Sequence, residues 1–574
     1  MVYQGYNYEC LIDQLKDQSF FGAPNTLIFV APDVDALCAY KMLELILNEE
    51  YICHQCVAIS SEEDLRKWED RVNKDSVYKT IILINCGGAF DIGGIFKITS
   101  KDHLKIFVLD SHRPYNCRTL FHYDQVIVLD EDHYKDTLEK LYDSYARLMD
   151  LNEKSRDLER QESEYVEERR GNKRQRIETR ASTSKKAKAD TDDEKQKLKK
   201  ELANYEQSPP YYSKSVARLV YTMSLKISKA SLEDHPSTKN LLWWAIIGLA
   251  SQYINSLITE EAYKEEYTYY LEVLKLIKHE DMKPMYMVAP ANGSDNNIRR
   301  EQNWRSYLTE MGISLNQSRQ EFIAVRTEIG PKLHEKLAKF AESHKVKDLE
   351  FPSFARTYGF HTTLTACDAA YALNALIDTF TEHAESVGCQ IDSADKASSK
   401  LEKDSWWNFY SASDSVDDIT SAIKLSKNIQ QFIVERCNEI IQKRNAIKKE
   451  GRIHFVVLGS GGAQDLLSHP RILRRFANFL ASAYKEKSTK DKKIAMIVVV
   501  PILDNTCYLV IGVMAGQIKN PLPTLFIQTI ATLPETIAND LRFPSFSKDV
   551  FVIPQKDYAV FKEKLILIDA QAAN

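Results

Sequence analysis

Polar side chains follow three apolar, strand-like runs near the start of the chain. In chain order they are Asp33 and Asp35, then Asn85, then Asp110 and His112. In parallel sheets, ligands gather beyond the carboxyl ends of the strands, so we expect these side chains to lie close together. Carboxylate oxygens in such a place suit a hard divalent cation such as Mg²⁺ or Mn²⁺.

A structural reading of the same residues is also open. Asp35 stands at the start of a helix-like stretch, where its carboxylate would cap the first turn while Asp33 faces water. Hydrogen bonds at strand ends would account for the remaining aspartate in the same way. Under this reading the residues stabilise the fold and bind nothing.

The elements that would position these residues alternate between strand and helix over residues 1–150. The strand-like runs are at 26–30, 54–59, 79–85, 104–109 and 125–129. Helix-like stretches at 35–49 and 61–72 lie between them. This alternation predicts an α/β domain with a largely parallel sheet and crossover helices.

Residues 151–210 form a charged linker in our interpretation. Positions 151–200 hold 16 basic and 12 acidic residues, and few aliphatic residues interrupt them. Such a segment buries too little apolar surface to offset its ordering entropy, although close Glu/Lys and Glu/Arg spacings favour solvated helices. Its basic clusters are candidates for a nuclear localisation signal or a nucleic-acid contact. They contain Lys173, Arg174, Arg176, Lys185, Lys186 and Lys188.

Residues 211–448 have mainly helical patterns and are predicted to be a helical region between two α/β lobes. Within it, residues 349–360 are rich in aromatic side chains and include Pro352, Arg356 and Gly359. We expect this segment to be a loop packed on the core or a protruding contact for a partner.

Residues 449–574 return to an α/β pattern. A glycine-rich turn that includes Gly459, Gly461 and Gly462 lies between a strand-like run and a helix-like stretch. Backbone N–H groups in such a turn can bind phosphate. Arg471, Arg474 and Arg475 follow on or near one helical face. The turn and the arginines together form a candidate nucleic-acid site, and the alternative is a tight turn beside a solvated helix.

The composition is that of a globular protein, with 44% hydrophobic and 27% charged residues and a net charge of −5. This charge argues against wholesale wrapping of DNA but allows a local basic groove. We expect no membrane span, because polar residues interrupt the most apolar helix-like stretch. The opening residues do not resemble a secretory signal, which favours a reducing nuclear or cytosolic compartment.

Five short sequence motifs resemble those of known proteins. They are Asp33-Val34-Asp35-Ala36-Leu37-Cys38, Ile84-Asn85-Cys86-Gly87, Asp110-Ser111-His112-Arg113-Pro114, the segment 242–249 and the segment 354–360. Their order resembles the DHH phosphoesterase superfamily, which includes the RecJ exonucleases. The closer resemblance is to the eukaryotic, RecJ-like replication factor of the cell-division-cycle forty-five family. It implies a two-lobed, RecJ/DHH-like α/β fold with a helical interdomain insertion.

The sequence departs from the catalytic pattern of that superfamily. Ala31 stands where the enzymes have the first histidine of their opening motif, Asn85 where they have an aspartate, and Ser111 where they have a histidine of the DHH signature. Two-metal catalysis needs two cations about 3.5–4 Å apart. The three remaining carboxylates cannot neutralise four positive charges. We therefore expect a degenerate site that requires no cofactor and binds at most one Mg²⁺ or Mn²⁺ ion weakly.

The resemblance implies a nuclear, non-catalytic subunit of the replicative helicase that bridges the MCM ring and the GINS complex. It would act in replication initiation and fork progression, capture single-stranded DNA without sequence preference and have a DNA polymerase as a further candidate partner. One alternative is an active, metal-dependent DHH phosphoesterase or exonuclease on single-stranded DNA, which would rest on Asp33, Asp35, Asp110 and His112. Another is a protein scaffold with no affinity for DNA.

Overall fold

The computed structural model divides into two compact units. The first holds residues 1–31 and 43–227, and the second holds residues 32–42 and 228–574. The described residues are 25–74, 78–98, 104–131, 135–169, 181–227, 236–277, 281–288, 312–318, 350–359, 362–380, 406–407, 409–443, 445–459, 464–488, 493–502, 506–515 and 521–571, with Leu11, Leu15 and a few single positions between 333 and 343.

The first unit is built on a five-stranded sheet whose neighbouring strands are all parallel. In spatial order the strands are β2 (His54–Ala58), β1 (Thr26–Val30), β3 (Thr80–Ile84), β4 (Lys105–Leu109) and β6 (Val126–Leu129). The predicted parallel sheet is confirmed. Ile84 pairs with Leu109 and Leu109 with Leu129, so Asn85, Asp110 and Asp130 follow their strands at the same edge of the sheet.

Helices and one short ribbon complete this unit. The helices are α2 (Val34–Glu49, from residue 43 onward), α3 (Glu62–Lys74), α4 (Ile92–Ile95), α5 (Cys117–Phe121) and α8 (Val216–Ile227). The two-residue strands β5 (His112–Arg113) and β7 (Tyr211–Tyr212) pair antiparallel, so residues just after the charged segment are bonded to the strand that carries His112.

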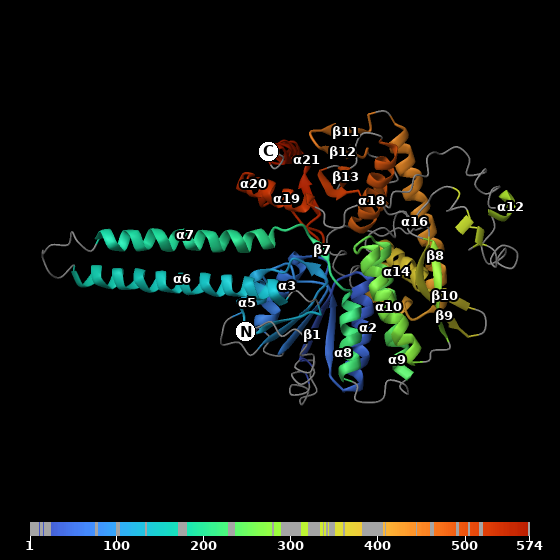
Figure 1. Ribbon diagram of the computed structural model, residues 1–574, viewed down its shortest axis with the longest axis horizontal. Helices are drawn as coiled ribbons and strands as arrows, with labels where there is room; N and C mark the ends of the chain where they lie inside the picture. Colours follow the sequence, from blue (N-terminus) through green and yellow to red (C-terminus); the bar gives the residue numbers. More distant parts are fainter. Residues whose placement is uncertain are drawn as a thin grey trace. The chain divides into compact units, whose positions relative to one another are not determined.

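Two long helices, α6 (Lys135–Arg169) and α7 (Ala181–Glu206), lie side by side as a hairpin (Figure 1). The first begins before the charged segment and continues into it, and the second lies within it. Leu148 and Leu202 are buried, and the Arg147 side chain donates to Glu194 at 3.0 Å. Solvated helices were expected here, and the described residues confirm them. A narrow line of leucines and exposed ion pairs is enough to hold such a hairpin together.

The helical part of the second unit contains a small sheet that the sequence did not predict. The helices are α9 (Pro236–Ile254), α10 (Glu260–Ile277), α12 (Leu315–Ser318), α14 (Ala366–Phe380) and α16 (Val416–Gln442). The antiparallel sheet has the order β10 (Thr362–Thr365), β9 (Glu350–Tyr358), β8 (Met282–Val288). The prediction of a loop at 349–360 is therefore wrong, because residues 350–358 form strand β9. Its aromatic residues face helices, since Phe351 and Phe354 are buried and contact Tyr263 and Tyr267 of α10.

A second five-stranded sheet forms the end of this unit, in the order β11 (Ile447–Glu450), β12 (Ile453–Val457), β13 (Ala495–Ile502), β14 (Cys507–Met514), β15 (Val550–Pro554). Only β12 and β13 pair in parallel, through the crossover helices α17 (Gln464–Leu467) and α18 (Pro470–Lys487). Alternate residues of β13 face two different cores, one against α16 and α18 and one against α19 (Leu522–Ala531) and α21 (Gln555–Gln571). The short α20 (Glu535–Ala538) lies between those last two helices in the sequence.

Among the described residues, no helix is both long enough and apolar enough to cross a membrane.

Candidate functional site

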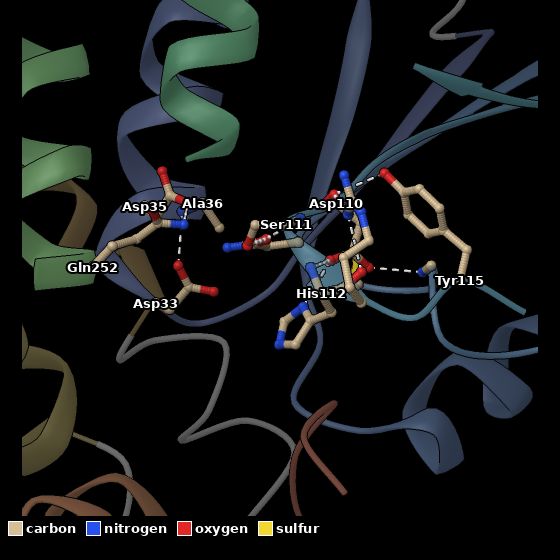
Figure 2. Close-up of polar contacts among 12 residues, drawn as sticks. Asp33, Asp35, Ala36, Asp110, Ser111, His112, Tyr115 and Gln252 are labelled. Carbon is tan, nitrogen blue, oxygen red and sulfur yellow. Dashed lines mark hydrogen bonds and ion pairs between the residues drawn. The ribbon is translucent and has the colours of Figure 1, made fainter. Parts of the chain in front are cut away.

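Asp110 follows β4 at the edge of the parallel sheet and is hydrogen-bonded to its own loop and to the loop that follows β3. Its Oδ2 atom accepts from the Gly88 N–H at 2.7 Å, and Oδ1 accepts from the His112 N–H at 2.9 Å and lies 2.7 Å from His112 Nδ1 (Figure 2). Burial acts to raise the pKa of Asp110, but His112 and the backbone N–H groups outweigh it and lower the pKa. Both carboxylate oxygens are thus engaged within the chain.

Asn85 and Ser111 form a neutral pair beside Asp110. The Asn85 side-chain oxygen accepts from the Ser111 hydroxyl at 2.7 Å and from the Ser111 N–H at 3.1 Å. Asn85 has φ +55°, a left-handed conformation that asparagine tolerates better than most residues. The two positions that depart from the catalytic pattern therefore bond to each other, and the pair brings no negative charge.

Arg113 supplies a fixed positive charge at this edge. Its guanidinium donates to the Asp110 carbonyl at 2.8 Å and to Asp130 at 2.8 Å, with both side chains of that ion pair buried. The guanidinium also lies 3.9 Å from the centre of the Tyr115 ring. Sequence reasoning missed Asp130 and Tyr115, although Asp130 follows the fifth apolar run just as Asp110 follows the fourth.

Gly88 shows how closely this loop is packed. A Cβ atom there would stand 2.9 Å from the Tyr115 ring and 3.0 Å from Asp110 Oδ2. Glycine is therefore required for the N–H of residue 88 to reach the carboxylate.

Asp33 and Asp35 lie in the second unit, at the start of α2. Asp33 is the N-cap, because its Oδ1 atom accepts from the Ala36 N–H at 2.8 Å and its carbonyl accepts from the Leu37 N–H at 3.0 Å. Asp35 is buried, and Gln252 of α9 donates to it at 3.4 Å (Figure 2). The structural reading was therefore wrong about both residues, since it gave the cap to Asp35, which is buried, and left Asp33, which is the cap, to water.

The donor set does not fit a two-metal centre. Asp110 is engaged on both oxygens and Asn85 carries no charge. In the part of the chain that the structure describes, no group of three or more His, Cys, Asp or Glu side chains could hold a metal ion. Weak binding of a single Mg²⁺ or Mn²⁺ ion stays a prediction.

The three arginines of the candidate nucleic-acid site are bonded to acids of the same unit. Arg471 and Arg475 both donate to Asp378 of α14, whose side chain is 1% exposed, and Arg474 donates to Asp549 at 2.7 and 2.9 Å. Burial acts to raise the pKa of Asp378, but Arg475, His469 and Arg471 outweigh it and lower the pKa. Arg471 also donates to the Pro32 carbonyl, beside the Asp33 cap.

The rest of the predicted nucleic-acid and localisation residues are only partly described. Gly459 is exposed just after β12, while Gly461 and Gly462 lie outside the described residues. Lys173, Arg174 and Arg176 also lie outside them. Lys185, Lys186 and Lys188 belong to α7. Their roles stay predictions.

The fold and this strand-end cluster define a class of α/β protein in which polar side chains follow the strands of a parallel sheet at one edge. The CDC45 family model matches residues 26–308 and 297–568, and the chain belongs to this family. The Cell division control protein 45 homolog of Schizosaccharomyces pombe is 26% identical, with 87% of each chain covered. The human homolog is 23% identical, with 94% of this chain and 96% of its own length covered.

A crystal structure of CDC45 from Entamoeba histolytica shares the fold. Its TM-score is 0.64 at 16% identity, and the match covers 97% of this chain and 98% of that one. Family membership makes the protein a DNA replication factor and confirms the predicted α/β fold class.

Proposed function

We propose that this replication factor is a nuclear, non-catalytic subunit of the replicative helicase that bridges the MCM ring and the GINS complex. The observation that carries the non-catalytic part is the Asn85–Ser111 hydrogen bond of 2.7 Å. It puts a neutral pair where a two-metal hydrolase needs anionic or imidazole ligands. Asp110, with both oxygens engaged, supports the same conclusion.

Helicase association and sequence-independent capture of single-stranded DNA complete the proposal, with a DNA polymerase as a further partner. Two observations are compatible with a bridging subunit. The chain has separate compact units, and the described side chains of the α6–α7 hairpin include exposed charged groups, such as Arg147 and Glu194, on which a partner could dock.

The catalytic question is tested with 5′-labelled single-stranded DNA and Mn²⁺. We expect no metal-dependent shortening by the wild-type protein and the same result for Asp33→Asn. Asparagine caps a helix about as well as aspartate, so this variant removes a carboxylate without unfolding α2. Shortening that Asp33→Asn abolishes would make the protein an active phosphoesterase.

The bridging role is tested by reconstitution from purified components. The protein should co-elute with the MCM ring only when GINS is present, or with both more tightly than with either one alone. Independent, unlinked binding to the two partners would contradict a bridging role.

A further inference from the structure

Lysines gather around one end of α18 in the second unit. They come from the C-terminal ends of α16 and α18 and from the edge strand β11, and we name them the lysine surface. Its members are the exposed Lys443, Lys449 and Lys487 and the half-buried Lys485.

Two sets of contacts show that these three elements meet. The Lys487 ammonium donates to the Ile441 carbonyl in the last turn of α16 at 2.8 Å. Lys449 pairs in register with His454 of β12, and the His454 ring lies 5.4 Å from Tyr484 of α18. Lys449 therefore lies on the face of the sheet that α16 and α18 cover, and it belongs to one surface with the lysines of both helix ends. Lys448 pairs with Phe455 and projects from the opposite face.

The two sequence stretches that supply this surface are rich in basic residues. Residues 443–452 contain five basic residues and one acid, and residues 485–493 contain five basic residues and two acids, in a chain of net charge −5. Two charges of the first stretch are paired, since Glu450 is bonded to Lys562 at 2.5 Å and Arg452 to Asp569 at 2.6 Å. A local positive field of this kind attracts polyanions even when the whole protein is acidic.

We propose that the lysine surface binds the phosphate backbone of nucleic acid, which rests on the proposed function and gives its DNA contact a location. Lysine is a flexible point charge, suited to contacts that need no fixed register. A protein partner would need an apolar core to its interface. Along β11 and β12, Val457 is the one large apolar side chain that is well exposed. A phosphate backbone requires no such core.

The test compares two triple variants by fluorescence anisotropy with labelled single-stranded and double-stranded oligonucleotides over a range of salt. Lys443→Ala/Lys449→Ala/Lys487→Ala removes three charges from the surface. Lys67→Ala/Lys275→Ala/Lys424→Ala is the matched control, since it removes three exposed lysines elsewhere. Each single-strand phosphate contact contributes about 0.7 to the slope of log K against log salt, so the first variant should reduce this slope by about 2 and the control should not. We expect affinity at low salt to fall at least tenfold.

Equal slopes and affinities for the two variants would overturn the inference, as would a wild-type protein that binds neither oligonucleotide. Thermal melts of both variants exclude unfolding as the cause of any loss. Comparing the two strand types shows whether the surface prefers single strands, which the proposed function requires. Association with MCM and GINS is measured on the same samples. If that association fails while lysine-dependent binding persists, the proposed function fails and the inference stands.

Discussion

The two ends of α18 use positive charge in different ways. Arg471 and Arg475, in the first turns, are bonded to the buried Asp378, whereas Lys487 in the last turn is exposed and donates to a neighbouring helix end. A cation is disfavoured near the positive end of a helix dipole and favoured near the negative end. The arginines therefore need an acid within the fold, and the lysines can remain in water. A run of basic residues in a sequence thus does not by itself locate a binding surface.

Removing Asp378, the acid that Arg471 and Arg475 share, should have the largest effect on the free energy of unfolding. Asp378→Ala leaves two largely buried guanidinium groups without their carboxylate, and breaking a buried ion pair in this way costs about 3–5 kcal/mol of unfolding free energy. Urea unfolding measures the loss. Glu563→Ala, at an exposed site on α21, is the control and should change stability little. A loss below about 1 kcal/mol would mean that the arginines are satisfied by water.

Asp110 is a second buried acid that is bonded within the fold, and its contribution to the free energy of unfolding should depend on pH. Asp110→Asn loses the charge that His112 and two N–H groups stabilise, at a cost of about 1–3 kcal/mol near neutral pH. Because folding lowers the pKa of Asp110, its stabilisation is complete above the unfolded pKa of about 3.9 and is lost as pH falls below that value. The stability gap between wild type and variant should therefore narrow below pH 4. A gap that stays constant to pH 3 would show that the charge contributes nothing.

A smaller effect is expected at the α2 cap. Asp33→Ala should cost about 1 kcal/mol, because the Ala36 N–H loses its acceptor, and Asp33→Asn should cost a few tenths at most. Thermal denaturation of the two variants side by side measures the difference. Equal losses would indicate that the carboxylate acts through its charge and not through capping.

The smallest effect on stability belongs to the lysine end. Lys487→Ala should change the unfolding free energy by about 0.5 kcal/mol, because an exposed cation in the last turn of a helix contributes about 0.3–1 kcal/mol. Chemical denaturation checks this. A loss comparable to that of Asp378→Ala would remove the contrast between the two ends of α18.

Local patterns in the sequence predicted the sheets better than they predicted the partners of charged side chains. The buried parallel strands appear as continuous apolar runs, so β1, β3 and β4 were placed correctly. The bond between Arg471 and Asp378 joins residues 93 positions apart, and no local pattern encodes such a pairing. The aromatic strand β9 was taken for a loop because Pro352 and Gly359 mark turns, and its pairing with β8 depends on residues far away in the sequence.

At the strand-end site, the sequence identified Asn85, Asp110 and His112 but not what holds them. The sequence shows an asparagine at position 85, but its hydrogen bond to Ser111 depends on how the two strands are placed in the fold. Asp33 was expected to bind metal or face water, and its role as the cap depends on which of two nearby residues begins the helix. Helix ends are the least certain boundaries in any sequence reading.

The discontinuous second unit has a consequence for synthesis on the ribosome. Residues 32–42 leave the ribosome early, but they belong to a unit whose remaining residues begin at 228, and Arg471, which bonds to Pro32, is 439 positions later. At translation rates of about 5–20 residues per second, that segment waits roughly 20 to 90 s for its last partner. During that interval the apolar start of α2 lacks its final neighbours, so a chaperone would have time to bind it.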